Sequence, residues 1–167
     1  MSLLLPARRF VLKGGIASLA ATATGLLHPR SARAADACGG LSREDFETYI
    51  SIFSENDRDD YAQFYTEDVL YERGQNHTMQ GIQAVVDFYR EVHEHLTQRL
   101  TVVNYAATAT FIGAEVHSEF TIFKDFKHES GLDFKAGEHF IGHNFVHYGL
   151  RGTRISHIKS ASFRRIA

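Results

Sequence analysis

The sequence predicts an α+β protein, a cone-shaped single domain in which three N-terminal helices pack on a curved, mostly antiparallel sheet. Two observations support this class. Apolar residues recur at helical spacing in the first part of the chain, and apolar and polar residues alternate with a period of two after Gln98. Helices followed by a run of long strands favour an antiparallel sheet over the regular helix–strand alternation of a parallel one.

The three helices are marked by caps and apolar stripes. Ser42, with Asp45 three residues later, forms a capping box before the first helix. A short second helix is expected after Asp59 and Asp60, and Gly81 opens the third. The inward stripes are Phe46, Tyr49, Ile50 and Phe53 in the first helix, and Ile82, Val85, Val86, Tyr89, Val92 and Leu96 in the third.

Strands are expected at five places. A short one, at 69–71, follows the second helix and ends before Gly74. The four long strands are expected at 100–110, 115–124, 138–150 and 154–164. Gly113, the region of Gly131 and Arg151-Gly152 supply the turns between them. Long strands joined by turns of this kind form antiparallel neighbours.

The charge balance argues against a nucleic-acid partner. The 167 residues carry a formal net charge of −2, but the first 34 hold five of the eighteen basic residues and no acidic one. The rest therefore carries thirteen basic against twenty acidic residues, a net charge of −7, which phosphate repels. Thirteen Phe and seven Tyr without Trp fit a core or cavity walled by aromatic rings.

The N-terminal segment has the order of an export signal. Arg8-Arg9-Phe10-Val11-Leu12-Lys13 precedes a short apolar run, and a basic stretch ends in Ala32-Arg33-Ala34. The paired arginines are typical of the twin-arginine route, and a general secretory signal is the alternative. We expect 1–34 to be the signal peptide, 35–40 a mobile arm and 41–167 the folded domain. The mature protein would be periplasmic or secreted, with no membrane span, and a lipid anchor on Cys38 is a further alternative.

The middle of the chain resembles a known family. The stretch from Tyr49 to Gly74, with Asn56-Asp57, Phe64-Tyr65-Thr66-Glu67-Asp68-Val69 and Gly81-Ile82, resembles the SnoaL-like branch of the nuclear transport factor 2-like superfamily. The resemblance extends over Leu41 to Phe163 as a pattern of elements. It implies a pocket for a small apolar organic molecule and a homodimer through the open face of the sheet. Since such families include isomerases, dehydratases, aldol-type cyclases, epoxide hydrolases and binding domains, it does not select a reaction.

Strand alternation selects candidate residues for the pocket. In the third long strand, one face carries Phe140, Gly142, Asn144, Val146 and Tyr148. In the fourth, the more apolar face carries Ile155, His157, Lys159, Ala161 and Phe163, so we expect it to point inward. His157 and Lys159 would then lie in an apolar wall, where acid–base groups are often placed. A hydrogen-bonded core histidine and a lysine that reaches water at the rim are the open alternatives.

The resemblance implies roles for two residues, but the catalytic bases of the related enzymes are replaced in this sequence. Tyr49 stands where similar steroid isomerases place a tyrosine that donates to an oxyanion, and Asn144 where similar dehydratases carry an asparagine. Arg73 stands where those isomerases carry their catalytic carboxylate. Glu119 and Thr121 replace the arginine–aspartate pair of similar epoxide hydrolases, and Asn104 and Phe120 replace the paired histidines of the dehydratases. Each of these mechanisms therefore lacks its base.

No metal or other cofactor is expected. His139, His143 and His147 are four apart in a stretch that reads as a strand, which separates neighbours in this series by roughly 13 Å. Zinc requires ligands at about 2 Å, so two such histidines cannot share one ion unaided. We expect these histidines on the outer face of the sheet.

Two functions remain open from the sequence. The first is a cofactor-independent lyase, isomerase or cyclase that acts on a small apolar, ring-containing carbonyl or phenolic compound. Tyr49 and Asn144 would hold the oxyanion, and His157 or Lys159 would move the proton. The substrate-binding residues would be Tyr71, Arg73, Phe120, Phe140 and Tyr148. The second is a non-catalytic periplasmic binding or accessory domain, which the arginine at position 73 favours.

Overall fold

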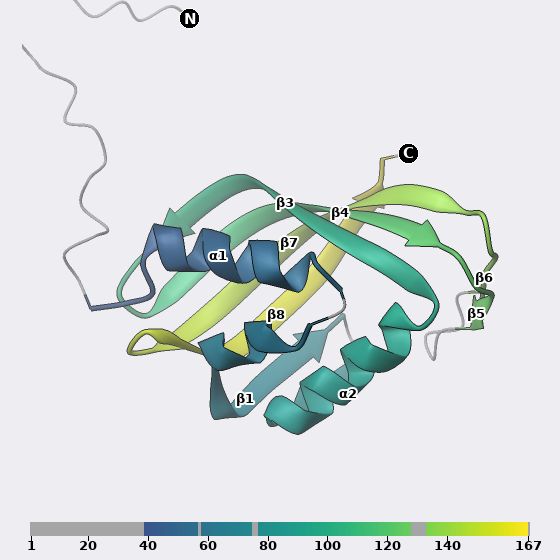
Figure 1. The fold of residues 1–167 in the computed structure, drawn as a ribbon. Helices are drawn as coiled ribbons and strands as arrows, with labels where there is room; N and C mark the ends of the chain where they lie inside the picture. Colours follow the sequence, from purple (N-terminus) through teal and green to yellow (C-terminus); the bar gives the residue numbers. More distant parts are fainter. Residues whose placement is uncertain (1–38, 57, 75–76, 128–132, 167) are drawn as a thin grey trace, which may run out of the picture. The chain divides into compact units, whose positions relative to one another are not determined.

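Four long C-terminal strands lie side by side and form most of the sheet (Figure 1). The computed structural model describes residues 39–56, 58–74, 77–127 and 133–166. All of them belong to one compact unit, Ala32–Ala167. The expected signal peptide (1–34), most of the expected arm (35–40) and Cys38 lie outside the described residues.

The first half of the described chain contains both α-helices. Their order is α1 (Arg43–Phe53), a 3₁₀ turn η1 (Asp60–Phe64), β1 (Tyr65–Arg73), β2 (His77–Gln80) and α2 (Ile82–His93). The second half contains β3 (Leu96–Ala107), β4 (Phe111–Ile122), β5 (Phe126–Lys127), β6 (Asp133–Phe134), β7 (His139–Arg151) and β8 (Arg154–Arg165). The α+β class is therefore confirmed.

Within the described residues, six strands form one sheet in the order β2-β1-β8-β7-β4-β3. Every neighbouring pair is antiparallel except β1 and β8, which run parallel. The prediction of a mostly antiparallel sheet is thus confirmed. β5 and β6 pair separately as a two-stranded hairpin.

The prediction of three helices is wrong, because the described residues contain two α-helices. The second expected helix is the 3₁₀ turn η1, five residues long. Tyr65 already has extended backbone and begins β1, so the chain has room for little more than one helical turn after Asp59. Short segments of this kind adopt the tighter i→i+3 pattern. For the same reason β1 begins four residues before the short strand expected at 69–71.

The ends of α1 are fixed by side-chain hydrogen bonds. Ser42 caps the N-terminus, since its Oγ accepts from the backbone N–H of Asp45 at 3.0 Å, as the capping box predicts. After the helix, Asn56 adopts a left-handed conformation (φ 65°), which asparagine tolerates better than most residues. Its amide donates to the Gln98 carbonyl at 3.0 Å and its oxygen accepts from the Gln98 N–H at 2.6 Å. Asn56 therefore joins the end of α1 to β3.

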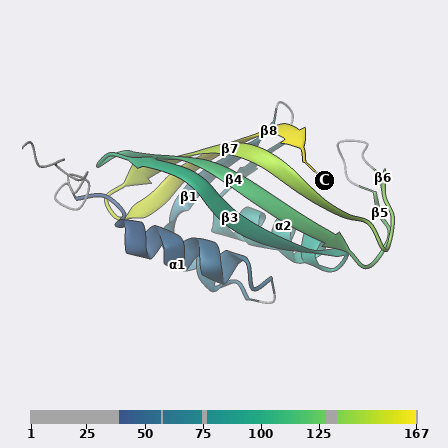
Figure 2. The ribbon, with the colours of Figure 1, turned by 90° about the horizontal axis from the view of Figure 1, so that it is seen from above.

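Both α-helices lie on the same side of the sheet (Figures 1 and 2). The first helix contacts β3, whereas the second contacts β1, β2 and β3. Their buried residues include the predicted stripes Phe46, Tyr49, Ile50 and Phe53, and Val85, Val86, Tyr89 and Val92. In the described part of the chain, neither helix is long and apolar enough to cross a membrane.

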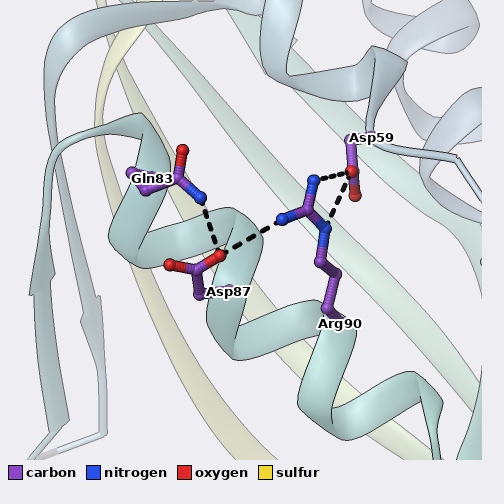
Figure 3. Close-up of polar contacts among 4 residues, drawn as sticks. All are labelled: Asp59, Gln83, Asp87 and Arg90. Carbon is purple, nitrogen blue, oxygen red and sulfur yellow. Dashed lines mark hydrogen bonds and ion pairs between the residues drawn. The ribbon is translucent and has the colours of Figure 1, made fainter.

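A surface ion-pair network joins α2 to the segment before η1 (Figure 3). Arg90 donates from Nε to Asp59 at 2.9 Å and from Nη1 to Asp87 at 3.3 Å. Gln83 donates to the same Asp87 oxygen at 2.7 Å. All four side chains are solvent-exposed, so the network orients α2 more than it stabilises the core.

Two β-bulges interrupt β8, and both place the extra residue on that strand. Gly149 and Leu150 of β7 pair with His157 and Ile155, so Ser156 is the additional residue of the first bulge. A second register shift occurs where His143 and Asn144 pair with Arg164 and Ser162. An extra residue moves the side chains beyond it to the opposite face.

Candidate functional site

A cavity of about 770 Å³ lies on the inner side of the sheet, the side covered by the helices. Its walls are mostly aromatic. Phenylalanines from α1, α2 and four strands contribute, namely Phe53, Phe88, Phe120, Phe126, Phe134 and Phe140. Phe140 stacks on Phe120 at 4.9 Å and on Phe134 at 5.5 Å between ring centroids. A cavity of this size and character suits a small, largely apolar organic molecule.

One pair of tyrosine hydroxyls lies at the cavity wall beneath α1. Tyr49 and Tyr65 are both buried, and their hydroxyl oxygens are 3.0 Å apart. Burial raises the pKa of both phenols well above the usual value, so both stay protonated. One hydroxyl donates to the other, which leaves the second hydrogen for another acceptor.

A second group of hydroxyls joins α2, β1 and β8. The Tyr71 oxygen is 2.9 Å from that of Tyr89 and 3.3 Å from Oγ of Ser160. Three hydroxyls supply three hydrogens and these two contacts use two, so one remains for a ligand oxygen. Burial is the main cause that raises the pKa of Tyr89, and it outweighs the opposing positive charge of Arg73.

Asn144 and Ser118 form a third polar group, between β7 and β4. The Asn144 amide donates to Oγ of Ser118 at 2.9 Å and to the carbonyl of Gly142 at 3.3 Å. Both amide hydrogens are therefore engaged. The Ser118 hydroxyl accepts one of them, so its own hydrogen points elsewhere. We infer that Ser118, oriented by Asn144, is the better placed donor of the two.

The charged groups around the cavity are cationic. Among the described lining residues, Arg73, Arg164 and Arg165 are the arginines, and no aspartate or glutamate occurs. The Arg165 guanidinium lies 3.8 Å from the ring centroid of Phe140, and that of Arg73 lies 5.7 Å from Phe88. The described polar lining thus consists of hydroxyls, amides, one imidazole and cations, which favours electron-rich oxygen in a ligand.

Seven of the nine predicted site residues line this cavity. They are Tyr49, Asn144, Tyr71, Arg73, Phe120, Phe140 and Tyr148. The whole predicted inner face of β7 is among the lining residues, because both bulges add their extra residue to β8 and leave the alternation of β7 regular. The roles assigned to these seven residues stay predictions.

The prediction that His157 and Lys159 face the interior is wrong. Ile155 and Ile158 are both buried although three residues apart, because the extra Ser156 reverses the alternation between them. Ile158, Ser160 and Ser162 therefore line the cavity, whereas Lys159 lines a groove on the opposite face.

On that outer face, His157 and Lys159 share one carboxylate. Glu72 accepts from Nε2 of His157 at 2.5 Å and from Nζ of Lys159 at 3.2 Å. The hydrogen bond from His157 is the largest cause that lowers the pKa of Glu72, followed by the one from Lys159. Gly149 lies opposite His157, and a Cβ at that position would stand 3.1 Å from the Cβ of His157. The absence of a side chain at Gly149 therefore leaves room for the side chain of His157.

The histidines predicted on the outer face lie there. His139 pairs with Glu119 at 2.9 Å and His143 with Glu115 at 2.6 Å, while His147 stacks on Phe111. His117 lies opposite His143 in the register of β4 and β7. Within the described residues, no group of three or more His, Cys, Asp or Glu side chains is arranged to hold a metal ion.

The sequence reasoning missed many of the lining residues. Among the polar ones are Tyr65, Tyr89, Ser118, Ser160, His77 and Arg165. The sequence predicts Tyr65 on one side of the short second helix, and Ser160 on the outer face of the last strand. His77 lies on β2, a strand that the sequence reasoning did not identify. Tyr89 was predicted on the inner stripe of α2, but a position on that stripe does not tell a cavity-lining residue from an ordinary core residue.

Comparison with known proteins agrees with this architecture. The model of the SnoaL-like domain matches residues 46–158. A search of curated protein sequences gives no significant match. A SnoaL-like polyketide cyclase from Agrobacterium tumefaciens strain C58 has a similar structure, with a TM-score of 0.58 at 16% identity over 72% of this chain and 91% of that one.

Two other solved structures are similar at still lower identity. One is an epoxide hydrolase of the LEH-like type from M. tuberculosis, with a TM-score of 0.57 at 11% identity over 71% of this chain and 79% of that one. The other is a protein of ketosteroid isomerase-like fold from Catenulispora acidiphila, with a TM-score of 0.59 at 10% identity over 72% of this chain and 86% of that one. At these identities the likeness shows the fold alone. The family model covers two thirds of the sequence, and the chain belongs to the SnoaL-like domain family.

Proposed function

We propose that the protein is a cofactor-independent enzyme of the isomerase, lyase or cyclase kind that acts on a small apolar, ring-containing carbonyl or phenolic compound. The observation that carries the proposal is the aromatic cavity whose described polar groups are hydroxyls, amides, an imidazole and arginines. Such a lining stabilises an enolate or phenolate oxygen as negative charge develops on it. Structural similarity to a SnoaL-like polyketide cyclase supports the same class.

The developing oxyanion would be held by hydroxyl donors. The tyrosine pair Tyr49–Tyr65 and the group Tyr71–Tyr89–Ser160 each retain one hydrogen for a ligand, as the count of donors shows. These donors are fixed before the substrate enters, since neighbouring hydroxyls and rings hold them in place. Preorganised donors of this kind account for a large part of catalysis in enzymes that form oxyanions.

Proton transfer would be carried out by His77. It is the one histidine among the described cavity-lining residues, its ring lies 5.0 Å from Phe88, and it faces Arg73 in the register of β1 and β2. Imidazole is the side chain that most often transfers protons in enzymes. His77 would thus take the part first assigned to His157 or Lys159.

The test is a ligand screen followed by product analysis. The protein from residue 35 is screened by thermal shift against small aromatic, terpenoid and polyketide-like carbonyl and phenolic compounds. Each compound that stabilises it is then incubated with it and examined by mass spectrometry and NMR. Conversion that falls about a hundredfold in His77→Gln is expected. Conversion unaffected by His77→Gln but abolished by His157→Ala or Lys159→Ala would contradict the interior assignment.

A non-catalytic binding domain is the second candidate. It is favoured by the lack of a carboxylate among the described lining residues and by the outward position of His157 and Lys159. A binding domain would return every stabilising compound unaltered, and its interior variants would change affinity only. Recovery of a changed compound would contradict it.

We also propose that the protein forms a homodimer through the outer face of the sheet. Phe145 and Phe163 are 50% and 63% exposed there, with ring centroids 5.7 Å apart. Exposed aromatic side chains on one face are typical of association surfaces. Light scattering should give twice the monomer mass, and Phe163→Glu should give the monomer. A monomeric wild-type protein would contradict the dimer.

Export remains a proposal as well. We propose that residues 1–34 direct the protein to the periplasm or outside the cell by the twin-arginine route. Replacement of both Arg8 and Arg9 by lysine should retain the unprocessed chain in the cytoplasm. Normal processing of that variant would favour the general secretory route.

A further inference from the structure

The arginines at the cavity narrow the class of compound that fits it. This inference rests on the proposed function, because it concerns the ligand of the same cavity. An apolar cavity that binds a neutral ring compound needs no cation at its wall. Nevertheless the described lining includes Arg73, Arg164 and Arg165, and it includes no aspartate or glutamate.

Arg165 has the geometry of an anion-binding group. It lies opposite Gly142 in the register of β7 and β8, and its guanidinium rests 3.8 Å from the ring centroid of Phe140. This cation–π contact holds the guanidinium against the aromatic wall. Its contact with Glu138 is 3.8 Å long, beyond the length of a hydrogen bond. Its N–H groups therefore have room for a bidentate carboxylate.

The surroundings of Arg165 favour a planar aromatic acid. Phe120 and Phe134 both stack on Phe140, with interplanar angles of 30° and 13°. A further ring inserted along this stack would bring a carboxyl substituent toward the guanidinium over Phe140. The second bulge of β8 places Arg165 opposite Gly142, a residue of β7 that lines the cavity.

We propose that the cavity takes an aromatic or polycyclic compound that bears a carboxylate, and that Arg165 binds this carboxylate. The carboxylate stays intact and serves as an anchor. The reacting carbonyl or phenol oxygen is then held further along the cavity, at the tyrosine hydroxyls. Arg73 also lines the cavity, affects Tyr89 electrostatically and adds to the positive potential.

The test compares two probes with the same ring system, one an anion and the other its neutral methyl ester. 2-Naphthoate and methyl 2-naphthoate are titrated into the protein at neutral pH by calorimetry. The acid should bind at least about tenfold tighter than the ester, and high ionic strength should weaken the acid alone. Arg165→Gln should abolish this preference and Arg165→Lys should keep part of it. Arg151→Gln is the matched control, because Arg151 is an exposed arginine that pairs with Asp68 and does not line the cavity.

The outcomes separate this inference from the proposed function. Equal binding of acid and ester, or an acid preference that survives Arg165→Gln, would overturn the carboxylate anchor and leave the proposed function standing. Failure of both probes and of every ring compound in the screen to bind would overturn both. The Arg165 variants are not expected to unfold the protein, since the side chain is 55% exposed.

Discussion

The two faces of the sheet carry different kinds of polar group. The inner face carries neutral hydroxyls and amides, as in Tyr71, Ser160 and Asn144, with arginines at its margin. The outer face carries glutamate–histidine pairs, Glu72 with His157, Glu115 with His143 and Glu119 with His139. Groups that ionise near neutral pH are thus concentrated on the outer face.

The difference follows from the cost of burying charge. A hydroxyl pair such as Tyr49–Tyr65 satisfies its hydrogen bonds without charge, so the cavity wall can hold it away from water. A carboxylate in the same wall would need a partner charge or a proton. On the outer face, Glu72 is partly solvated and accepts hydrogen bonds from His157 and Lys159. Histidines and lysines in a strand are therefore weak indicators of a site until the face of each is known.

The largest expected effect distinguishes the two faces by stability. Phe46 is 0% exposed and contacts Tyr49, Tyr105 and Tyr148, whereas Phe163 is 63% exposed on the outer face. Phe46→Ala should lower the free energy of unfolding by about 3–5 kcal/mol through lost burial and a cavity. Phe163→Ala should change it by no more than about 0.5 kcal/mol in the monomer. Urea denaturation at low protein concentration measures both.

A large effect of Phe163→Ala that grows with protein concentration would show that the outer face is covered by a second subunit. In that case the contrast between the faces holds for the isolated chain only. A large effect that is independent of concentration would contradict the contrast itself.

The second effect concerns the hydroxyls of the inner face. Tyr49→Phe removes a donor from the cavity and should lower turnover on the order of a hundredfold, as loss of one oxyanion donor does in other enzymes. Tyr61→Phe is the matched control. Tyr61 is also a buried tyrosine, but it does not line the cavity, and its hydroxyl has no hydrogen-bond partner among the described residues. Its replacement should leave turnover unchanged, and equal losses in both variants would indicate a structural effect.

Sequence periodicity predicted the inner and outer faces of β7 correctly, but it assigned those of the neighbouring strand β8 the wrong way round. β7 alternates without interruption from Phe140 to Tyr148, so its inner face was predicted in full. β8 contains an extra residue at Ser156, and every assignment after it fell on the wrong side. A signal was present, because Ile155 and Ile158 are three apart, a spacing that a regular strand does not place on one face.

The remaining differences have local causes as well. The prediction of a second α-helix was wrong because the five residues between Asp59 and Tyr65 form little more than one helical turn. The donors Tyr65, Ser118 and Ser160 could not be identified from the sequence, since a hydroxyl becomes a site group only through its neighbours across strands. Tyr49 and Asn144 were found through the family resemblance, which carries information on position that composition and spacing do not.

The third effect is a dependence of stability on pH below 6.5. Burial lowers the pKa of His93 from its ordinary value of 6.5, while Nε2 has no hydrogen-bond partner among the described residues. The unfolded chain therefore binds this proton first as the pH falls below 6.5, and stability decreases with it. His93→Gln should flatten this decrease, measured as the urea midpoint against pH. His147→Gln, an exposed histidine of the outer face, is the control and should leave the slope unchanged.

The smallest effect tests the outer face in acid. Hydrogen bonds from His157 and then Lys159 lower the pKa of Glu72 from its ordinary value of 4.5. A depressed carboxyl pKa contributes stability that is present above 4.5 and is lost as the pH falls through the lower, folded-state value. Glu72→Gln should therefore reduce the steepness with which the melting temperature falls below pH 4.5. Glu91→Gln, at an exposed position of α2, is the control. A variant that melts as steeply in acid as the wild type would show that water already screens this pair, and the contrast between the faces would then rest on the interior alone.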